Sequence, residues 1–240
     1  MSKAHADWKV LDHGPLEQLA DNLYRVEGAV PGMSLRRVMT VVRRSDGSLL
    51  VHNPVALDEA RRTQLEALGP VGVIVTPSAI HRLDTPAFKS RYPQALVFCP
   101  TGARSQVSQV VTVDGVYEDY QDDGVVSFQP LDGVAGAEGA MLVRSSDGVT
   151  VVLNDVVMNM DKRPDLLGHV ITTVLGSAPG PRVSRLSKWV LVKDQAALRA
   201  HLERLANLPD LVRLVVSHDK VASGPEAAAA LRAAASYLNA

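Results

Sequence analysis

Residues 42–55 read VRRSDGSLLVHNPV, and residues 143–156 read VRSSDGVTVVLNDV. Aligned without a gap, the two segments are identical at 8 of 14 positions and lie 101 residues apart. In each segment an Asp-Gly pair separates two apolar runs, which predicts a β-hairpin. A favoured turn explains the Asp-Gly pair, but it does not explain the Val-Arg before it or the Asn after it. We therefore interpret the segments as an internal duplication, with halves of roughly residues 20–125 and 126–240.

The rest of the chain alternates short apolar runs with helical patterns. Residues 71–75 are typical of a fully buried strand, and residues 58–68 predict a helix capped by Asp58. Two hairpin-and-helix halves imply two sheets that face each other with helices outside them, so we predict an α/β fold, a four-layer αββα sandwich. No linker of disordered composition separates the halves. Residues 1–240 are therefore treated as a single domain.

Composition narrows the function classes. The chain has 240 residues, is 46% hydrophobic and 21% charged, and carries a formal net charge of −1. Such a balance is typical of a globular chain and argues against nucleic-acid or anionic-membrane partners. The sequence shows no signal-peptide pattern and no apolar run long enough for a membrane span, so we expect a cytoplasmic protein. Only 4% of residues are aromatic, so the core must consist of Val, Leu, Ala and Ile.

Four apolar runs end in residues of metal-ligand type. The residues that follow these runs include His52, His81, Asp155 and His218. In open α/β sheets, ligands bind outside the carboxyl ends of strands, so these side chains form a candidate cluster. Histidine and aspartate together suit zinc or iron. Because His, Asp and Asn are also common turn residues, each position taken alone favours an ordinary strand end, and only the cluster together with the repeat points to a site.

The order of elements resembles the metallo-β-lactamase superfamily over nearly the whole chain. The matching segments are LADNLYRVEG (19–28), the hairpin at Asp46-Gly47, VIVT (73–76), PLDGVAG (130–136), VLND (152–155) and VVSH (215–218). The resemblance implies a duplicated αββα sandwich, in agreement with the repeat. It also implies a two-metal site that activates water for hydrolysis.

The histidine-rich signature of that superfamily, H-x-H-x-D-H, is altered in this chain. Its first two histidines fall on Pro77 and Ala79, and its last histidine falls on Arg82. His81 stands at or beside the aspartate of the signature. Pro and Ala cannot bind a metal through their side chains, so we predict that the usual dinuclear site does not form.

Other ligand positions of the superfamily are only partly kept. The resemblance places Asp155 on the bridging carboxylate and His218 on the last histidine. His52 falls where the superfamily usually has an aspartate beside the metal ligands. The remaining family histidine falls near Gly133, with Asp132 next to it.

Three functions therefore remain open. The leading one is a metal-free protein with a degenerate metal site that has lost the dinuclear hydrolase activity but retains a small-molecule binding pocket. The second is a single-metal hydrolase of a small ester, lactone or anionic substrate, with one zinc or iron ion. Its ligands would come from His52, His81, Asp155 and His218, with Asp132 in reserve, and His81 is also a possible base for a bound water. The third is a structural protein that assembles with itself, as a homo-oligomer, or with a partner.

Three arginines are candidates for substrate binding. Arg82 follows the altered signature, and Arg182 and Arg185 lie in a loop rich in Pro and Gly. In the resembled fold this loop often runs beside the pocket. We predict that the three guanidinium groups together receive an anionic group of the substrate.

Overall fold

The computed structural model describes residues 4–239, whose strands form two sheets. The seven-stranded sheet contains, in spatial order, β1 (Glu17–Ala20), β2 (Leu23–Val30), β3 (Met33–Arg43), β4 (Leu49–His52), β5 (Val71–Val75), β6 (Leu96–Cys99) and β7 (Gly115–Val116). The five-stranded sheet contains, in spatial order, β12 (Ala222–Ser223), β11 (Leu211–Val215), β10 (Gly148–Val152), β9 (Gly139–Ser145) and β8 (Val126–Pro130).

Helices flank these sheets and connect their strands. They are α1 (Glu59–Leu68), α2 (Thr85–Arg91), α3 (Arg104–Val107), α4 (Leu166–His169), α5 (Arg185–Val190), α6 (Gln195–Ala206) and α7 (Pro225–Ala235). A π-helical turn, Val170–Val174, extends α4. Asp58 caps α1 through the amide of Arg61, as the sequence predicts. Within residues 4–239, no helix combines the length and the apolar character that a membrane span requires.

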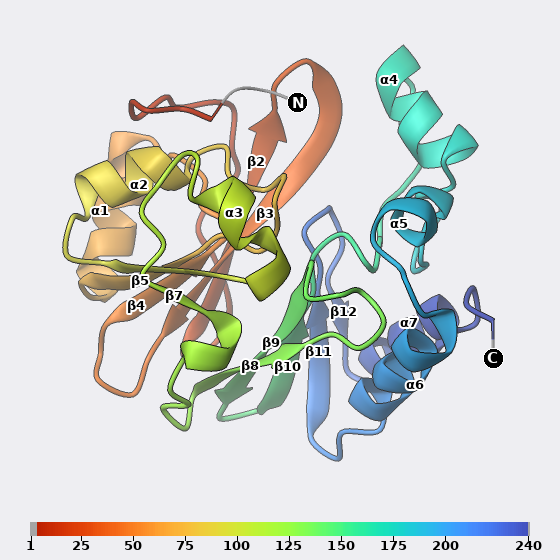
Figure 1. Ribbon diagram of the computed structural model, residues 1–240. Helices are drawn as coiled ribbons and strands as arrows, with labels where there is room; N and C mark the ends of the chain where they lie inside the picture. Colours follow the sequence, from red (N-terminus) through yellow and green to blue (C-terminus); the bar gives the residue numbers. More distant parts are fainter. Residues whose placement is uncertain (1–3, 240) are drawn as a thin grey trace.

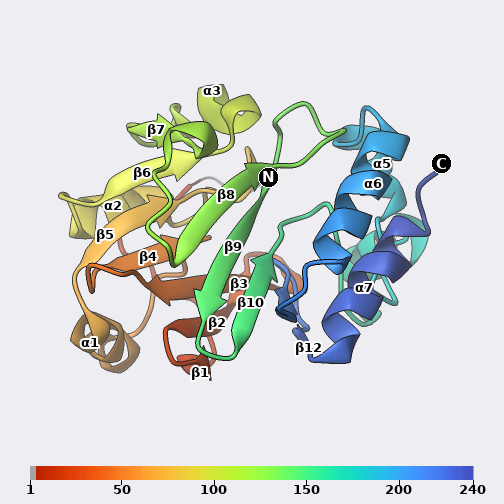
Figure 2. The same ribbon diagram turned by 90° about the horizontal axis from the view of Figure 1, so that it is seen from below.

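The layers follow the predicted αββα order. Figures 1 and 2 show the two sheets side by side, with α1 and α2 outside the seven-stranded sheet and α6 and α7 outside the five-stranded one. Three apolar clusters fill the interfaces. One lies between the sheets and includes Leu50 and Met141, one lies beneath α1 and α2 and includes Met39, and one lies beneath α6 and α7. The clusters occupy the three interfaces of a four-layer sandwich, so the αββα prediction is confirmed. Aliphatic residues dominate all three clusters, as the low aromatic content predicts.

Both repeated segments form hairpins, but their registers differ by one residue. Arg43 pairs with Leu49 in the first hairpin, whereas its counterpart Arg144 pairs with Val149 in the second. Successive side chains of a strand point to opposite faces. This shift therefore sends corresponding side chains of the returning strands, β4 and β10, to opposite faces of their sheets. Leu50 consequently lies in the cluster between the sheets, and its counterpart Val151 lies beneath α6 and α7.

Crossover connections bring four strand ends together. Strand β4 runs parallel to β5, and β10 runs parallel to β11. The segment after β11 also contacts the other sheet directly, because the amide of Val38 donates to the carbonyl of Ser217 at 2.8 Å. The residues that follow β4, β5, β10 and β11 therefore meet at one edge of the sandwich.

Candidate metal centre

His81, Asp155 and His218 converge at this edge. His81 lies in the loop after β5, Asp155 follows β10 and His218 follows β11. Nε2 of His81 lies 3.1 Å from both carboxylate oxygens of Asp155, and Nε2 of His218 lies 3.2 Å from Oδ1 of Asp155. One ligand atom from each residue lies within 4.8 Å of the other two. The two imidazole rings meet at 65° with centroids 5.5 Å apart, so their Nε2 atoms approach the carboxylate from different directions.

The outer nitrogen of each imidazole is held by an acceptor. Nδ1 of His218 lies 2.6 Å from the backbone carbonyl of Arg36, which can only accept, so Nδ1 carries the hydrogen. Nδ1 of His81 lies 3.1 Å from Oδ1 of Asn53. The amide nitrogen of Asn53 donates to the carbonyl of Val38 at 2.8 Å, which fixes the amide orientation, so Nδ1 of His81 is again the donor.

Two imidazole Nε2 atoms therefore face one carboxylate. In a neutral imidazole whose Nδ1 is protonated, Nε2 carries a lone pair, and a lone pair beside a carboxylate oxygen is repelled. The arrangement becomes stable in two ways. Either both imidazoles bind protons at Nε2, or a cation lies among the three groups.

The charges of the cluster stabilise one another. Burial alone would raise the pKa of Asp155, but His81 and His218 outweigh burial and hold this pKa far below its usual value. Burial alone would lower the pKa of His218, but its hydrogen bond to Asp155 and the charge of that carboxylate outweigh burial and raise it. The site therefore retains a carboxylate anion in a buried position, where a positive partner is strongly favoured.

A second carboxylate shapes the loop that carries Asp155. Glu138 is buried and accepts hydrogen bonds from the side chain of Asn154 at 3.1 Å and from the amides of Asp155 and Val156 at 3.2 and 3.0 Å. Burial, with a smaller contribution from the charge of Asp155, raises the pKa of Glu138 to about 8. The sequence interpretation missed this residue, because a lone Glu in a Gly-rich loop carries no spacing signal.

The cluster forms part of the wall of a pocket of about 260 Å³. Other residues of the wall are mostly apolar: Val30, Pro31, Met33, Leu35, Ile80, Leu83, Met158, Met160, Ile171 and Leu186. A concave, mainly apolar cavity with a few converging polar groups is the usual form of a small-molecule site.

His52, a predicted ligand, is not part of the cluster. Its side chain is buried, and within residues 4–239 none of its nitrogens belongs to the group of mutually close ligand atoms. Strand alternation puts His52 on the same face of β4 as Leu50, toward the space between the sheets. Its Nδ1 has no hydrogen-bond partner within the described residues. Burial, together with the charge of His81, lowers the pKa of His52 to about 3.

Asp132, the predicted reserve ligand, also lies elsewhere. Its carboxylate is half-exposed and pairs with Nδ1 of His201 at 3.1 Å and with the guanidinium of Arg204. Asp132 is not among the residues that form the pocket wall. The residues of the cluster follow strand ends of both sheets, whereas the carboxylate of Asp132 pairs with two residues of α6.

The structure separates the three predicted substrate-binding arginines. Arg82 lies in the pocket wall and donates to the backbone carbonyl of Gln106. Arg182 lies 4.8 Å over the ring of Tyr237, and Arg185 donates to the carbonyl of Val174 at 3.4 Å. Neither of these two belongs to the pocket wall, so the loop does not bring their guanidinium groups beside Arg82.

A family model described as "Domain of unknown function (DUF4336)" matches residues 29–112, which include Asn53 and His81 but not Asp155 or His218. No curated protein matches the chain by sequence.

Solved structures match over almost the full length. A DIM-1 metallo-β-lactamase exposed to ceftazidime has a TM-score of 0.63 at 12% identity, covering 95% of this chain and 99% of that one. A metallo-β-lactamase from Pontibacter korlensis has a TM-score of 0.60 at 10% identity, covering 92% and 98% of the two chains. The VMB-1 structure has a TM-score of 0.60 at 13% identity, covering 92% and 96%. Identity at this level establishes architecture alone, and with the two sheets and their flanking helices it shows that this chain has the metallo-β-lactamase fold.

Proposed function

We propose that His81, Asp155 and His218 bind one divalent metal ion, zinc or iron, and that the chain hydrolyses a small ester, lactone or anionic substrate in the adjoining pocket. One observation carries the proposal. Asn53 and the carbonyl of Arg36 orient the two imidazoles so that both Nε2 atoms face the same carboxylate. Acceptors on the outer nitrogen of a histidine are the usual support of a metal ligand.

The donor set fits such an ion. Two imidazoles and one carboxylate form the ligand set of many zinc and non-haem iron sites, and three protein ligands leave positions free for water or substrate. A metal ion bound there would supply a Lewis acid and a water of lowered pKa. The superfamily positions at Pro77 and Ala79 offer no ligand for a second ion, so the proposal retains the absence of dinuclear activity.

The residues of the chain then have distinct roles. Asp155 contributes the negative charge, and Glu138 holds the loop that carries it. We assign His81 as a ligand rather than a base, because Asn53 occupies one of its nitrogens and the other faces Asp155. The mainly apolar wall lowers the local dielectric around the reacting group, which strengthens electrostatic interactions within the site.

The test measures metal content and affinity in three proteins. The wild-type chain should retain about one ion per molecule after purification, or take it up when zinc or ferrous iron is added. The double variant Asp155→Asn/His218→Ala should lose it. Asp132→Asn is the matched control, because it alters an aspartate that also pairs with a histidine but lies outside the pocket, and it should bind like wild type.

A metal-free binding pocket is the second candidate. The raised pKa of His218 and the lowered pKa of Asp155 favour it, because a protonated imidazole at His218 also neutralises the carboxylate. A wild-type chain that takes up no ion and whose melting temperature is unchanged by zinc would contradict the metal proposal and support this candidate.

A further inference from the structure

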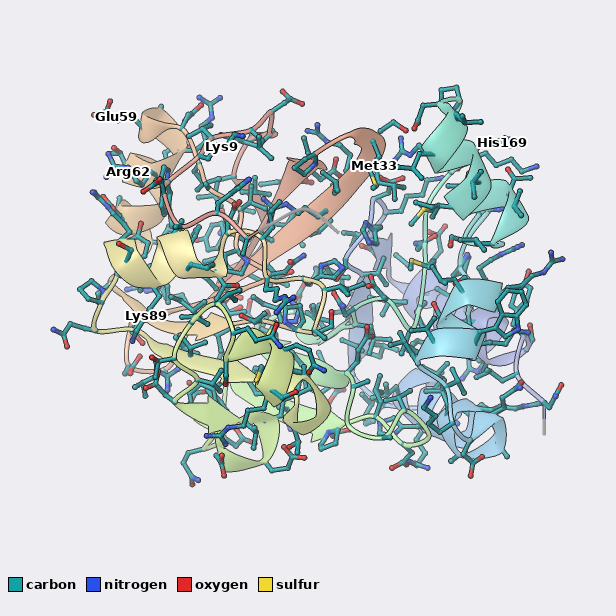
Figure 3. All side chains as sticks on the ribbon, turned by 45° about the horizontal axis from the view of Figure 1, so that its top comes forward. Lys9, Met33, Glu59, Arg62, Lys89 and His169 are labelled. Carbon is teal, nitrogen blue, oxygen red and sulfur yellow. The ribbon has the colours of Figure 1, made fainter. Side chains whose placement is uncertain are left out.

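The pocket wall outside the cluster is formed by flexible aliphatic and thioether side chains. Met33 and Leu35 come from β3, Met158 and Met160 follow β10, and Ile171 lies in the π-helical turn. Figure 3 shows Met33 at the tip of the β2–β3 hairpin, across from the helical segment that carries His169. Methionine adapts its shape and is polarizable, so three of them around one cavity suit a flexible hydrocarbon chain.

The two arginines of the wall, Arg37 and Arg82, are already bonded within the protein. The guanidinium of Arg37 forms a buried ion pair with Asp84 and donates to the carbonyl of Pro54 at 2.7 Å. Arg82 donates to the carbonyl of Gln106 and, at 3.1 Å, to the side chain of Gln109. An anionic ligand that paired with Arg37 or Arg82 would have to disrupt one of these arrangements, and a charged group packed against the apolar side chains would be costly.

One buried polar atom of the wall lacks a partner. The Oγ atom of Ser177 makes no hydrogen bond within residues 4–239, although Ser177 is fully buried and belongs to the pocket wall. A buried hydroxyl without a partner carries a desolvation penalty, which an acceptor oxygen of a ligand would relieve. The cavity of about 260 Å³ is smaller than the range typical of drug-sized ligands, so this ligand is small.

We propose that the pocket binds a small, uncharged carboxylic ester with an aliphatic acyl chain. The chain packs against the methionines, and an ester oxygen accepts from Ser177. This inference rests on the proposed function, because it takes the pocket as the place of hydrolysis. In that reaction the bond between the acyl carbon and the alcohol oxygen breaks, the hydroxyl of a water joins the acyl carbon, and a proton passes to the alcohol.

Binding is tested on the full-length, metal-free chain with methionine methyl groups labelled with carbon-13. Titration with ethyl hexanoate should shift the NMR signals of Met33, Met158 and Met160. Met39 and Met141 lie in core clusters away from the pocket, so their signals should stay in place as internal controls. Hexanoate has the same acyl chain but a negative charge, and it should bind at least about tenfold more weakly.

Variants connect the binding to the proposed contacts. Ile171→Gln should weaken ester binding, whereas Val174→Gln, in the same helical segment but outside the wall, should not. Ser177→Ala should weaken binding about 2- to 10-fold, as expected for the loss of one hydrogen bond.

Two outcomes would overturn the inference. One is a titration in which the three pocket methionines do not respond to the ester. The other is tighter binding of hexanoate than of the ester, lost on Arg82→Gln. Because the titration contains no metal, its failure leaves the metal test unaffected, and a failed metal test leaves this titration unaffected.

Discussion

At the scale of single residues, Asn53 has the most consequential position outside the three ligands. It follows β4 directly and adopts φ +57°, a conformation that Asn tolerates better than most residues. Its amide bridges the carbonyl of Val38 and the ring of His81. One side chain therefore connects the end of a strand to the tautomer of a proposed metal ligand.

Replacing this amide should weaken metal binding without removing a ligand. Asn53→Gly tolerates the positive φ and removes both hydrogen bonds, so we expect metal affinity to fall about 10- to 100-fold. The measurement is zinc titration by calorimetry. Asn22→Ala is the control, because Asn22 bonds the carbonyl of Arg144 far from the pocket. Unchanged affinity in Asn53→Gly would show that His81 needs no such support.

His52 should make the protein less stable in acid. Its native pKa is about 3, because burial and the charge of His81 disfavour the protonated form. The unfolded chain protonates this imidazole near pH 6.5. As the pH falls from about 6.5 toward 3, only the unfolded state gains the proton, so the free energy of unfolding decreases by up to about 1.4 kcal/mol per pH unit.

The variant His52→Leu isolates this contribution. Urea unfolding measures the free energy of unfolding of both proteins between pH 4 and 7. The difference in this free energy between wild type and variant should change with pH, with the wild type losing more stability in acid. Parallel pH profiles would contradict a buried neutral imidazole at this position.

At the scale of elements, the same Asp-Gly turn sequence is packed differently in the two hairpins. Gly47 has φ +81°, and a Cβ added there would meet nothing within 4 Å. Gly148 has φ +135°, and a Cβ there would lie 2.6 Å from the carbonyl oxygen of Asp210 and 2.7 Å from the side chain of Val212. The second turn is therefore packed against the end of β11, whereas the first has room around its glycine.

This difference predicts that alanine substitutions at the two turn glycines lower the free energy of unfolding by different amounts. Gly47→Ala should lower the free energy of unfolding by about 1–2 kcal/mol, because only the backbone conformation opposes it. Gly148→Ala should cost about 3 kcal/mol or more, because steric overlap is added to a conformation that is almost exclusive to glycine. Denaturant unfolding measures both, and equal costs would contradict the packing described for the second turn.

At the scale of the whole molecule, the two sheets share one core. Leu50 of β4 and Met141 of β9 lie in the same buried cluster between the sheets. The proposed metal ligands likewise come from both sheets. We therefore propose that residues 1–240 unfold as one cooperative domain, despite the repeated hairpin sequence.

Leu50→Ala should lower the free energy of unfolding by about 2–5 kcal/mol, the usual cost of a cavity at a fully buried leucine. Met39 reports on the seven-stranded sheet and Met141 on the five-stranded one. Within each protein the two methyl signals should disappear at the same urea concentration, and this concentration should be lower in the variant than in wild type. Leu96→Ala, a leucine that is 48% exposed on β6, is the control and should change stability little. Separate midpoints for the two methionines would indicate two independent domains.

The sequence alone determined most of the longer elements and their order, but not the short strands β1, β7 and β12 or the short helices α3 and α5. Apolar periodicity and turn chemistry act over a few residues, so the hairpins at Asp46-Gly47 and Asp147-Gly148, the cap at Asp58 and the buried strand at 71–75 are all where local patterns predict them. The same patterns identified His81, Asp155 and His218 as polar residues at strand ends. Burial of two apolar sheet faces then leaves the sandwich as the natural arrangement.

Only the tertiary structure decided which of these residues meet. His81 and Asp155 are 74 residues apart, and their contact depends on how two sheets pack against each other. A one-residue difference in register, invisible in the repeat, sends Leu50 and Val151 to opposite faces, and His52 is buried at the end of β4 without joining the cluster. Asn53, Glu138 and the stacking of Arg182 on Tyr237 depend equally on segments distant in the chain. Local sequence specifies backbone conformation, but the direction and partner of a side chain are set by register and packing.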